Sequence, residues 1–167
     1  LKLRVPGSPA AKLRYKSLGV EAVSISFSDV PIALAQKSID GLMTTHETVR
    51  SAKLWESGLK YSIDTQGVFY QYVPMIGKPT WDKLGSDLQK IITDTWAETV
   101  GPARNLAAAR QVSAREKGIA NGIANIKAAD KDLAAFREKL MKKQGDIIKK
   151  TRINADFAAS AEAVLGK

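Results

Sequence analysis

The first 58 residues alternate between strand-like and helix-like patterns, and this alternation limits the possible folds more than any other feature of the chain. Leu1, Leu3 and Val5 alternate with charged residues, as in a short strand. Ser8 then fits a helix N-cap, and Pro9 fits the first helical position. The expected strands are Leu1–Val5, Val23–Phe27 and Ile39–Met43, and the expected helices are Ala10–Leu18, Val30–Ser38 and Thr45–Gly58. This order predicts an α/β fold with a parallel sheet.

Arg4, Phe27 and Thr44 each stand at the carboxyl end of an expected strand, directly before a helix. In a parallel sheet these ends meet at one edge, where ligands bind in open α/β folds. Helix N-termini at that edge favour anions, and a guanidinium group forms two parallel hydrogen bonds with a carboxylate. We therefore expect Arg4 to bind a small organic acid, with Phe27 as an apolar wall and Thr44 and Thr45 as hydrogen-bonding groups.

Each of these residues also has a purely structural interpretation. Arg4 could point to solvent from an edge strand, and Phe27 could belong to the core. Thr45 suits the N-cap of the third helix. His46, the single histidine, stands at the start of that helix, where we expect a surface residue. Without cysteine or a second histidine, a metal site around it is not expected.

Two further strand patterns follow, at Tyr61–Thr65 and Val68–Ile76. The second is long and apolar enough to link two structural units. Tyr70 and Gln71 lie on it, and alternation places their side chains on opposite faces. We expect these two residues either to line a cleft or simply to pack.

The character of the chain changes at Ser86, where Ser86 and Gln89 match a capping box. Apolar residues at helical spacing then predict one long helix from Asp87 to about Lys117, kinked near Pro102 and broken by Gly118 and Gly122. The remaining pattern predicts a short strand at Ile123–Ala128, a helix starting at Asp130 and a last helix capped by Asn154.

Composition argues for binding without chemistry. The chain holds 26 basic and 17 acidic residues, and the excess of +9 is divided almost evenly between its halves. Lys142–Arg152 forms the densest basic cluster, for which a solvated helix face is the simpler reading and a nucleic-acid interface the less favoured one. The sequence contains no nucleotide-binding glycine motif, and its pattern shows no obvious pairing of a histidine with a serine or aspartate. We expect no enzyme, no catalytic residue, no metal and no cofactor.

Five segments, in this order and spacing, resemble the solute-binding proteins of tripartite ATP-independent periplasmic (TRAP) transporters. They are Leu3–Pro6, Ser26–Val30, Ile39–Gly41, Lys53–Glu56 and Thr80–Gln89. The resemblance implies a periplasmic-binding-protein-like α/β fold with two lobes that close on an organic acid. It assigns the carboxylate contact to Arg4 and a wall of the site to Phe27. Many sialic-acid and dicarboxylate members carry asparagine where this chain has Thr44, so their ligands are not carried over.

The resemblance covers only the second half of the family fold, which implies that the N-terminal half and the secretory signal are absent from this sequence. By analogy, residues 1–67 form most of the second lobe and residues 68–77 cross to the first lobe. Residues 78–117 hold a return segment and the long kinked helix that braces both lobes, and residues 118–167 pack back on the second lobe. The sequence is then a fragment, or part of a longer protein.

The function that the resemblance implies is capture of a small organic acid in the periplasm and delivery to a TRAP membrane permease. A ligand-sensing domain of the same fold in a signalling or regulatory protein is the alternative, and a basic nucleic-acid-binding protein is a weaker one. Because only one wall of a cleft is expected here, exposed apolar surface should favour self-association of the chain.

Overall fold

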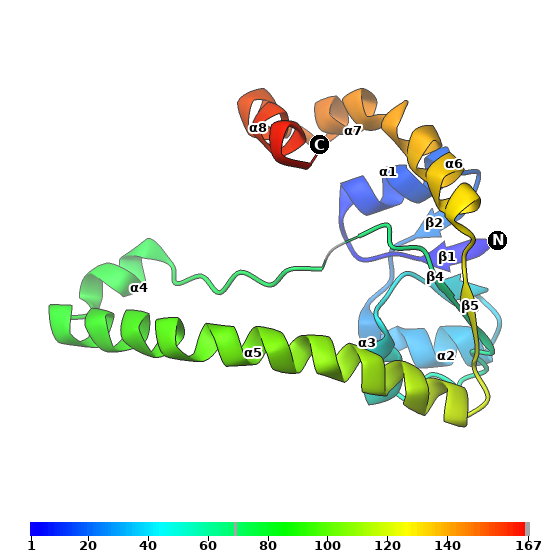
Figure 1. Ribbon diagram of the computed structural model, residues 1–167, viewed down its shortest axis with the longest axis horizontal. Coiled ribbons are helices and arrows are strands. Elements are labelled where there is room, and N and C mark those ends of the chain that lie inside the picture. The colour runs from blue at the N-terminus through cyan, green and yellow to red at the C-terminus, as the bar shows by residue number, and fades with distance from the viewer. Residues whose placement is uncertain (69, 166–167) are drawn as a thin grey trace.

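The computed structural model describes residues 1–68 and 70–165 and has a compact body from which a long arm extends (Figure 1). The strands are β1 (Lys2–Arg4), β2 (Glu21–Val23), β3 (Gly41–Leu42), β4 (Tyr61–Asp64) and β5 (Ala124–Lys127). The helices are α1 (Pro9–Ser17), α2 (Val30–Ala35), α3 (His46–Ser51), α4 (Lys78–Lys83), α5 (Ser86–Ala120), α6 (Asp130–Met141), α7 (Gln144–Thr151) and α8 (Ala155–Leu165), with a 3-10 turn at Phe27–Asp29.

The predicted parallel sheet is confirmed, with strand order β2-β1-β3 and all pairs parallel. Helix α1 lies on one face, and α2 and α3 lie on the other (Figure 1). The predicted N-caps of α1 and α3 are also confirmed, because Ser8 accepts a hydrogen bond from the Ala11 amide and Thr45 accepts one from the Thr48 amide. The βαβ order of the sequence therefore predicted the correct arrangement of sheet and helices in layers.

The second strand lies earlier in the chain than predicted: β2 shares only Val23 with the predicted strand Val23–Phe27, and Phe27 lies in the 3-10 turn. The last ladder bond runs from the Val5 amide to the Val23 carbonyl, at 2.8 Å. The next two bonds of this ladder would join the Ile25 amide to the Val5 carbonyl and the Gly7 amide to the Ile25 carbonyl, and neither forms in the described chain. The chain therefore leaves the sheet before Phe27, and the alternation of apolar residues up to Phe27 does not reflect strand pairing.

The core lies between the sheet, α2, α3 and the start of β5. Val5, Val30 and Leu54 are fully buried. The remaining buried apolar residues of the cluster are Ala33, Leu34, Ile39, Val49 and Ile123. Ile123 follows the C-terminal end of α5, so this core joins the C-terminal half of the chain to the unit formed by residues 1–67.

Helix α5 is 35 residues long and passes through Pro102 without interruption. Its N-cap is Gly85, so the predicted capping box at Ser86 is wrong; the Gln89 side chain instead donates to the carbonyls of Trp81 and Leu84, which end α4. Gly118 is buried inside the helix rather than at its end. The helix stops at Gly122, whose φ of 87° is readily adopted only by glycine. The kink near Pro102 stays a prediction.

Strand β5 pairs in parallel with β4, which confirms both predicted strands. By contrast, the predicted crossing strand at 68–76 is wrong for the described residues: 68 and 70–77 are extended chain with no strand pairing, and residue 69 lies outside the described part. A strand needs a neighbour for its hydrogen bonds, and no other strand of the described chain lies beside this segment. We call residues 68–77 the linker.

The linker and α5 run side by side away from the body, and α4 closes the far end of this arm (Figure 1). Helices α6, α7 and α8 return over α1, and α7 packs against it. None of the described helices is both long enough and apolar enough to cross a membrane.

His46 is not the free surface residue that its position suggested. Its Nε2 lies 2.8 Å from Oδ1 of Asp64, and both side chains are about a quarter exposed. The Asn125 amide nitrogen lies 3.4 Å from the same oxygen, and Arg115 lies 4.0 Å from Oδ2. Asp64 therefore joins α3, β4, β5 and α5 in one polar network.

We expect Leu54→Ala to lower the free energy of unfolding by about 2–5 kcal/mol, because it leaves a cavity in a fully buried position. Urea unfolding followed by circular dichroism measures this. Leu106→Ala, at a half-exposed position of α5, is the matched control and should cost about 0.5 kcal/mol or less. Equal effects of the two changes would contradict the core assignment.

We expect Asp64→Ala to lower the free energy of unfolding by about 1–3 kcal/mol, since His46, Asn125 and Arg115 lose their shared acceptor. The same urea experiment measures it. Asp82→Ala removes an exposed pair with Lys78 and should cost about 0.5 kcal/mol or less. An Asp64→Ala protein as stable as Asp82→Ala would show that the network does not hold these elements together.

Candidate functional site

The carboxyl edge of the sheet brings Arg4 and Phe27 together, as predicted from the strand ends. The Arg4 guanidinium carbon lies 5.6 Å from the centre of the Phe27 ring, a cation–π distance. Nε of Arg4 donates to the Ile25 carbonyl at 3.3 Å. These two contacts orient the guanidinium, and both depend on the chain leaving the sheet after Val23.

Arg4 is half-buried and has no acidic partner among the described residues. The single hydrogen bond of its side chain in the described chain uses Nε, so the two terminal nitrogens of the planar fork are left for another acceptor. The ring of Phe27 is 38% exposed, which leaves apolar surface beside the cation. A cation next to an exposed ring can hold a carboxylate and the carbon atoms attached to it.

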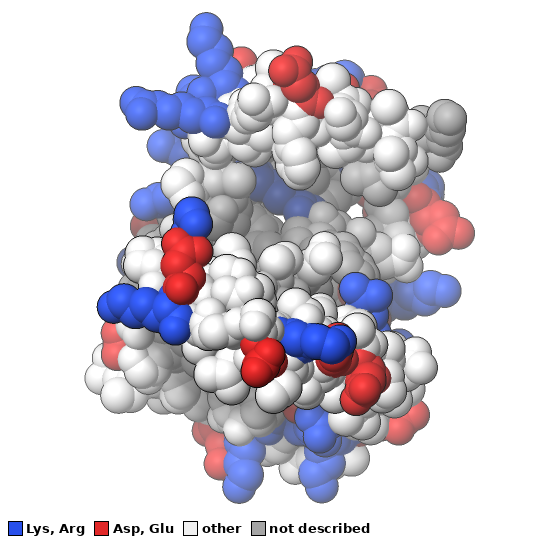
Figure 2. All heavy atoms as spheres, turned by 90° about the vertical axis from the view of Figure 1, so that its left-hand side faces the viewer, with Lys and Arg blue, Asp and Glu red and all other residues white. Residues whose placement is uncertain are grey.

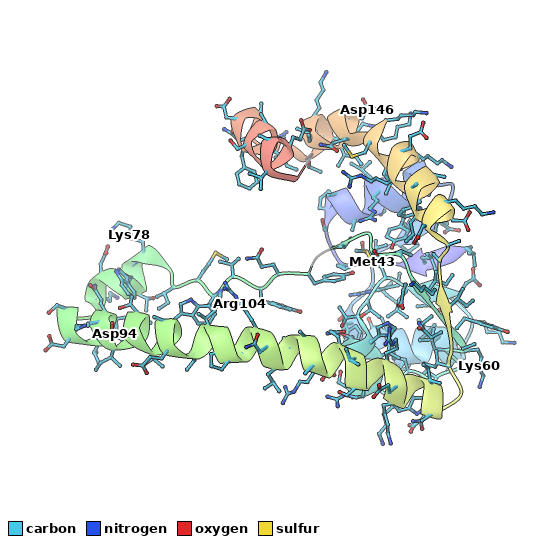
Figure 3. All side chains as sticks on the ribbon, in the orientation of Figure 1. Met43, Lys60, Lys78, Asp94, Arg104 and Asp146 are labelled. Atoms are coloured by element: carbon cyan, nitrogen blue, oxygen red, sulfur yellow. The ribbon has the colours of Figure 1, made fainter. Side chains whose placement is uncertain are left out.

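Thr44 and Thr45 follow β3 at the same edge, beside Arg4. The Met43 amide donates to the Arg4 carbonyl at 2.9 Å, so Thr44 is one residue beyond the last contact with β1. Figure 3 labels Met43 at this edge of the body, far from Lys78 and Asp94 at the end of the arm. Thr44 is half-buried, and its hydroxyl makes no hydrogen bond within the described chain. The Thr45 hydroxyl accepts from the Thr48 amide at 3.2 Å and is therefore engaged as an N-cap.

Tyr70 and Gln71 both lie on the linker, and both are exposed, Tyr70 to 40%. Burial raises the pKa of the Tyr70 phenol, and the neighbouring Tyr15 raises it further. Arg14 and Arg4 act in the opposite direction, because positive charge stabilises the phenolate. The Tyr70 hydroxyl is therefore within electrostatic reach of the Arg4 guanidinium, and nothing in the structure draws Gln71 to the same place.

Sequence reasoning missed Arg14 and Tyr15, which α1 places beside Tyr70. Burial also raises the pKa of Tyr15, against the lowering effect of Arg14. The signal in the sequence was an arginine between Leu13 and Tyr15, which otherwise form part of the apolar side of a short helix. No group of three or more histidine, cysteine or acidic residues in the described chain is arranged to hold a metal ion.

A large hollow lies elsewhere, on the arm. It has a volume of about 620 Å³ and is open and mostly apolar. Its lining residues are Pro74, Met75, Ile76, Trp81, Ile91, Ile92, Thr93, Thr95, Trp96 and Thr99. Figure 2 faces this end of the molecule, where uncharged side chains separate individual lysines and acids. We call this surface, formed by the linker, α4 and the first half of α5, the apolar face of the arm.

Comparison with known proteins matches this chain to one family. The model of the bacterial extracellular solute-binding proteins, family 7, matches residues 1–150. The sialic acid-binding periplasmic protein SiaP of Vibrio cholerae is 33% identical over 104 residues, which are 62% of this chain and 32% of SiaP.

Solved structures of TRAP solute-binding proteins share the fold. The ectoine-binding protein of Halomonas elongata superposes with a TM-score of 0.83 at 18% identity, over 90% of this chain and 49% of its own. A protein of Shewanella oneidensis with bound succinate gives the same TM-score and identity, over 90% of this chain and 50% of its own. The chain thus spans about half the length of these structures.

These matches confirm the predicted resemblance and the periplasmic-binding-protein-like α/β fold. The family is extracellular, in agreement with the predicted periplasmic location, and it consists of solute-binding proteins rather than enzymes. The chain belongs to the bacterial extracellular solute-binding protein family 7 and covers about half of the fold of its TRAP-transporter members.

Proposed function

We propose that this chain provides the carboxylate-binding wall of a TRAP-transporter binding protein, which captures a small organic acid and delivers it to a membrane permease. The observation that carries the proposal is Arg4 at the carboxyl end of β1, oriented by Phe27 and the Ile25 carbonyl and without an acidic partner in the described chain. A half-buried guanidinium without a counter-ion favours an anionic ligand over an empty site.

The ligands of the similar proteins support a carboxylate. Succinate, sialic acid and ectoine differ in size and polarity, yet each carries a carboxylate group. A bidentate arginine recognises that shared group and leaves the rest of the ligand to other contacts. In this chain those contacts would come from Phe27, Thr44, Thr45, Tyr70 and Gln71, with Tyr70 the best placed because its hydroxyl lies within electrostatic reach of Arg4.

A cleft needs a second wall, and the arm is the part of this chain that would meet it. In the division that we propose, residues 1–67 and 118–167 form one lobe, the linker crosses, and residues 78–117 join the other lobe. The apolar face of the arm supports this division, because Tyr72, Met75 and Ile91 are 95%, 86% and 59% exposed. The unmatched half of the similar structures is the natural cover for that surface.

We expect Arg4→Ala to weaken binding of an organic acid by about two orders of magnitude, because the ligand loses a charged, two-point partner. The assay is isothermal titration of a polypeptide carrying both halves of the fold. Its panel contains succinate, sialic acid, ectoine, a keto acid and an aromatic acid. Arg4→Lys keeps the charge without the fork and should bind between the two.

The matched control for this experiment is Arg104→Ala, which removes an exposed arginine of α5 that Figure 3 places out on the arm. It should leave affinity unchanged. If Arg4→Ala bound every acid of the panel as tightly as the unchanged protein, Arg4 would not be the carboxylate ligand.

We expect the 167-residue chain by itself to self-associate through the apolar face of the arm, since that surface lacks a cover. Sedimentation velocity should show oligomers that dissociate when Ile91 and Trp96 are both changed to Asp. Ile32→Asp, at an exposed apolar position of α2, is the control and should not change the sedimentation coefficient. Monomers at all concentrations of the unchanged chain would contradict this expectation.

A further inference from the structure

Arg14 contacts two segments that are distant from it in the sequence, at the point where the chain leaves the body for the arm. Its Nη1 donates a hydrogen bond to the Gly67 carbonyl, one residue before the linker. Its guanidinium carbon lies 5.6 Å from the centre of the Phe136 ring in α6 and 5.9 Å from that of its neighbour Tyr15. One side chain thus joins α1, the start of the linker and α6.

The fit between Arg14 and Gly67 is so close that a side chain at position 67 would displace the Arg14 guanidinium. A Cβ atom there would lie 2.0 Å from Nη2 of Arg14, 3.2 Å from its guanidinium carbon and 3.4 Å from Cε1 of Phe136. The φ of Gly67 is not in the left-handed region, so backbone conformation does not demand glycine. The close approach of the guanidinium does.

Arg14 stabilises this junction at an energetic penalty that an apolar side chain would not have. Its Nε is buried and finds no acceptor in the described chain, and no acidic side chain there pairs with it. A buried donor without a partner opposes folding, whereas an unbranched apolar side chain could fill the same space between two rings without that penalty. We therefore explain this arginine by the chain segment that it holds in place, and not by a gain in folding stability.

What it holds is the segment that carries Tyr70, three residues beyond Gly67. Tyr70 is 40% exposed, and the positive charges of Arg14 and Arg4 act to lower the pKa of its phenol, against the raising effect of burial. Within the described chain the linker has no strand partner to fix its path. The Gly67 carbonyl is therefore the last backbone group before Tyr70 with a contact that fixes the linker to the body in the described chain.

We infer that Arg14 is a positioning residue: it anchors the linker at Gly67, where the chain leaves the body, and thereby fixes the path of the segment that carries Tyr70 without touching the ligand. The placement of the linker stands on the geometry alone. Its consequence for affinity rests on the proposed function.

The first test measures the linker directly and needs no ligand. The chain has no cysteine, so Lys12→Cys on α1 and Tyr72→Cys on the linker, both exposed, take spin labels selectively. Electron–electron double resonance then gives the distribution of distances between α1 and the linker. We expect Arg14→Met to broaden and shift this distribution, and Arg14→Lys, which keeps a donor, to change it less.

Gly67→Ala should reproduce the effect of Arg14→Met, since the new Cβ displaces the guanidinium. Combined with Arg14→Met it should add little, because the anchor is already lost. Gly77→Ala is the matched control at the other end of the linker, where a Cβ meets nothing within 4 Å, and should leave the distribution unchanged. An unchanged distribution in both Arg14→Met and Gly67→Ala would overturn the inference, as would a large further effect of Gly67→Ala in the Arg14→Met background.

The second test measures affinity in the polypeptide that carries both halves of the fold. We expect Arg14→Met to weaken binding of the acid found for Arg4 roughly tenfold, through loss of a preorganised wall, while the melting temperature stays the same or rises. Circular dichroism checks that each variant is folded, and Arg14→Lys should recover part of the affinity. Unchanged affinity of Arg14→Met, or a loss matched by a fall in melting temperature, would show a merely structural role.

The two proposals fail separately. If Arg4→Ala leaves acid binding unchanged while Arg14→Met still releases the linker, the ligand site is wrong and the anchor stands. If Arg4→Ala abolishes binding while the distances between α1 and the linker stay unchanged in Arg14→Met, the proposed ligand site stands and the proposed anchor is overturned.

Discussion

The ladder between β1 and β2 stops after the bond from the Val5 amide to the Val23 carbonyl, and the ligand site depends on that stop. Beyond this bond the chain leaves the sheet and turns at Phe27 instead of continuing as a strand. The turn exposes the Ile25 carbonyl to Nε of Arg4 and places the Phe27 ring near its guanidinium. A longer ladder would have kept the Ile25 carbonyl in strand pairing and the ring on a sheet face.

The rest of the molecule divides into a body with its own core and an arm without one. Leu54, Val5 and Val30 are fully buried in the body, whereas the linker and the first half of α5 expose tyrosine, methionine, isoleucine and tryptophan side chains. Ala114 and Ile123, at the other end of α5, join the body and hold the helix in place. This contrast agrees with a chain that spans about half of the fold of its structural relatives, since an apolar surface of this kind is ordinarily covered.

Arg4 and Arg14 differ in how far the surrounding protein occupies their side chains. Arg4 has two terminal nitrogens without partners in the described chain, which suits a group that waits for a ligand. Arg14 is held by a carbonyl and two rings and keeps one buried donor unpaired, which suits a group that orders the polypeptide. In the composition both arginines simply contribute to the net charge of +9. Only their contacts in the structure distinguish the residue proposed to bind the ligand from the residue proposed to position the linker.

Much of the fold could be predicted from local signals. The β-α-β order required a parallel sheet, Ser8 and Thr45 cap their helices as expected, and β5 lies within its predicted range. The errors came where local pattern and long-range pairing compete. The alternation up to Phe27 and the apolar run at 68–76 both resemble strands, but strands exist only where a neighbour supplies hydrogen bonds.

What the sequence determined by itself is that Arg4 and Thr44 lie near one edge, because parallel strands must end on the same side, whereas Phe27 comes to Arg4 through the turn after β2. What the tertiary structure decided is which residues far apart in the chain meet there. The contact of Arg14 with Gly67, 53 residues apart, and the sharing of Asp64 by α3 and β5 leave no local signal, since no helical or strand period extends over such separations. Gly67 and Arg14 are related only in three dimensions, because the absence of a Cβ atom at Gly67 leaves room for the Arg14 guanidinium group.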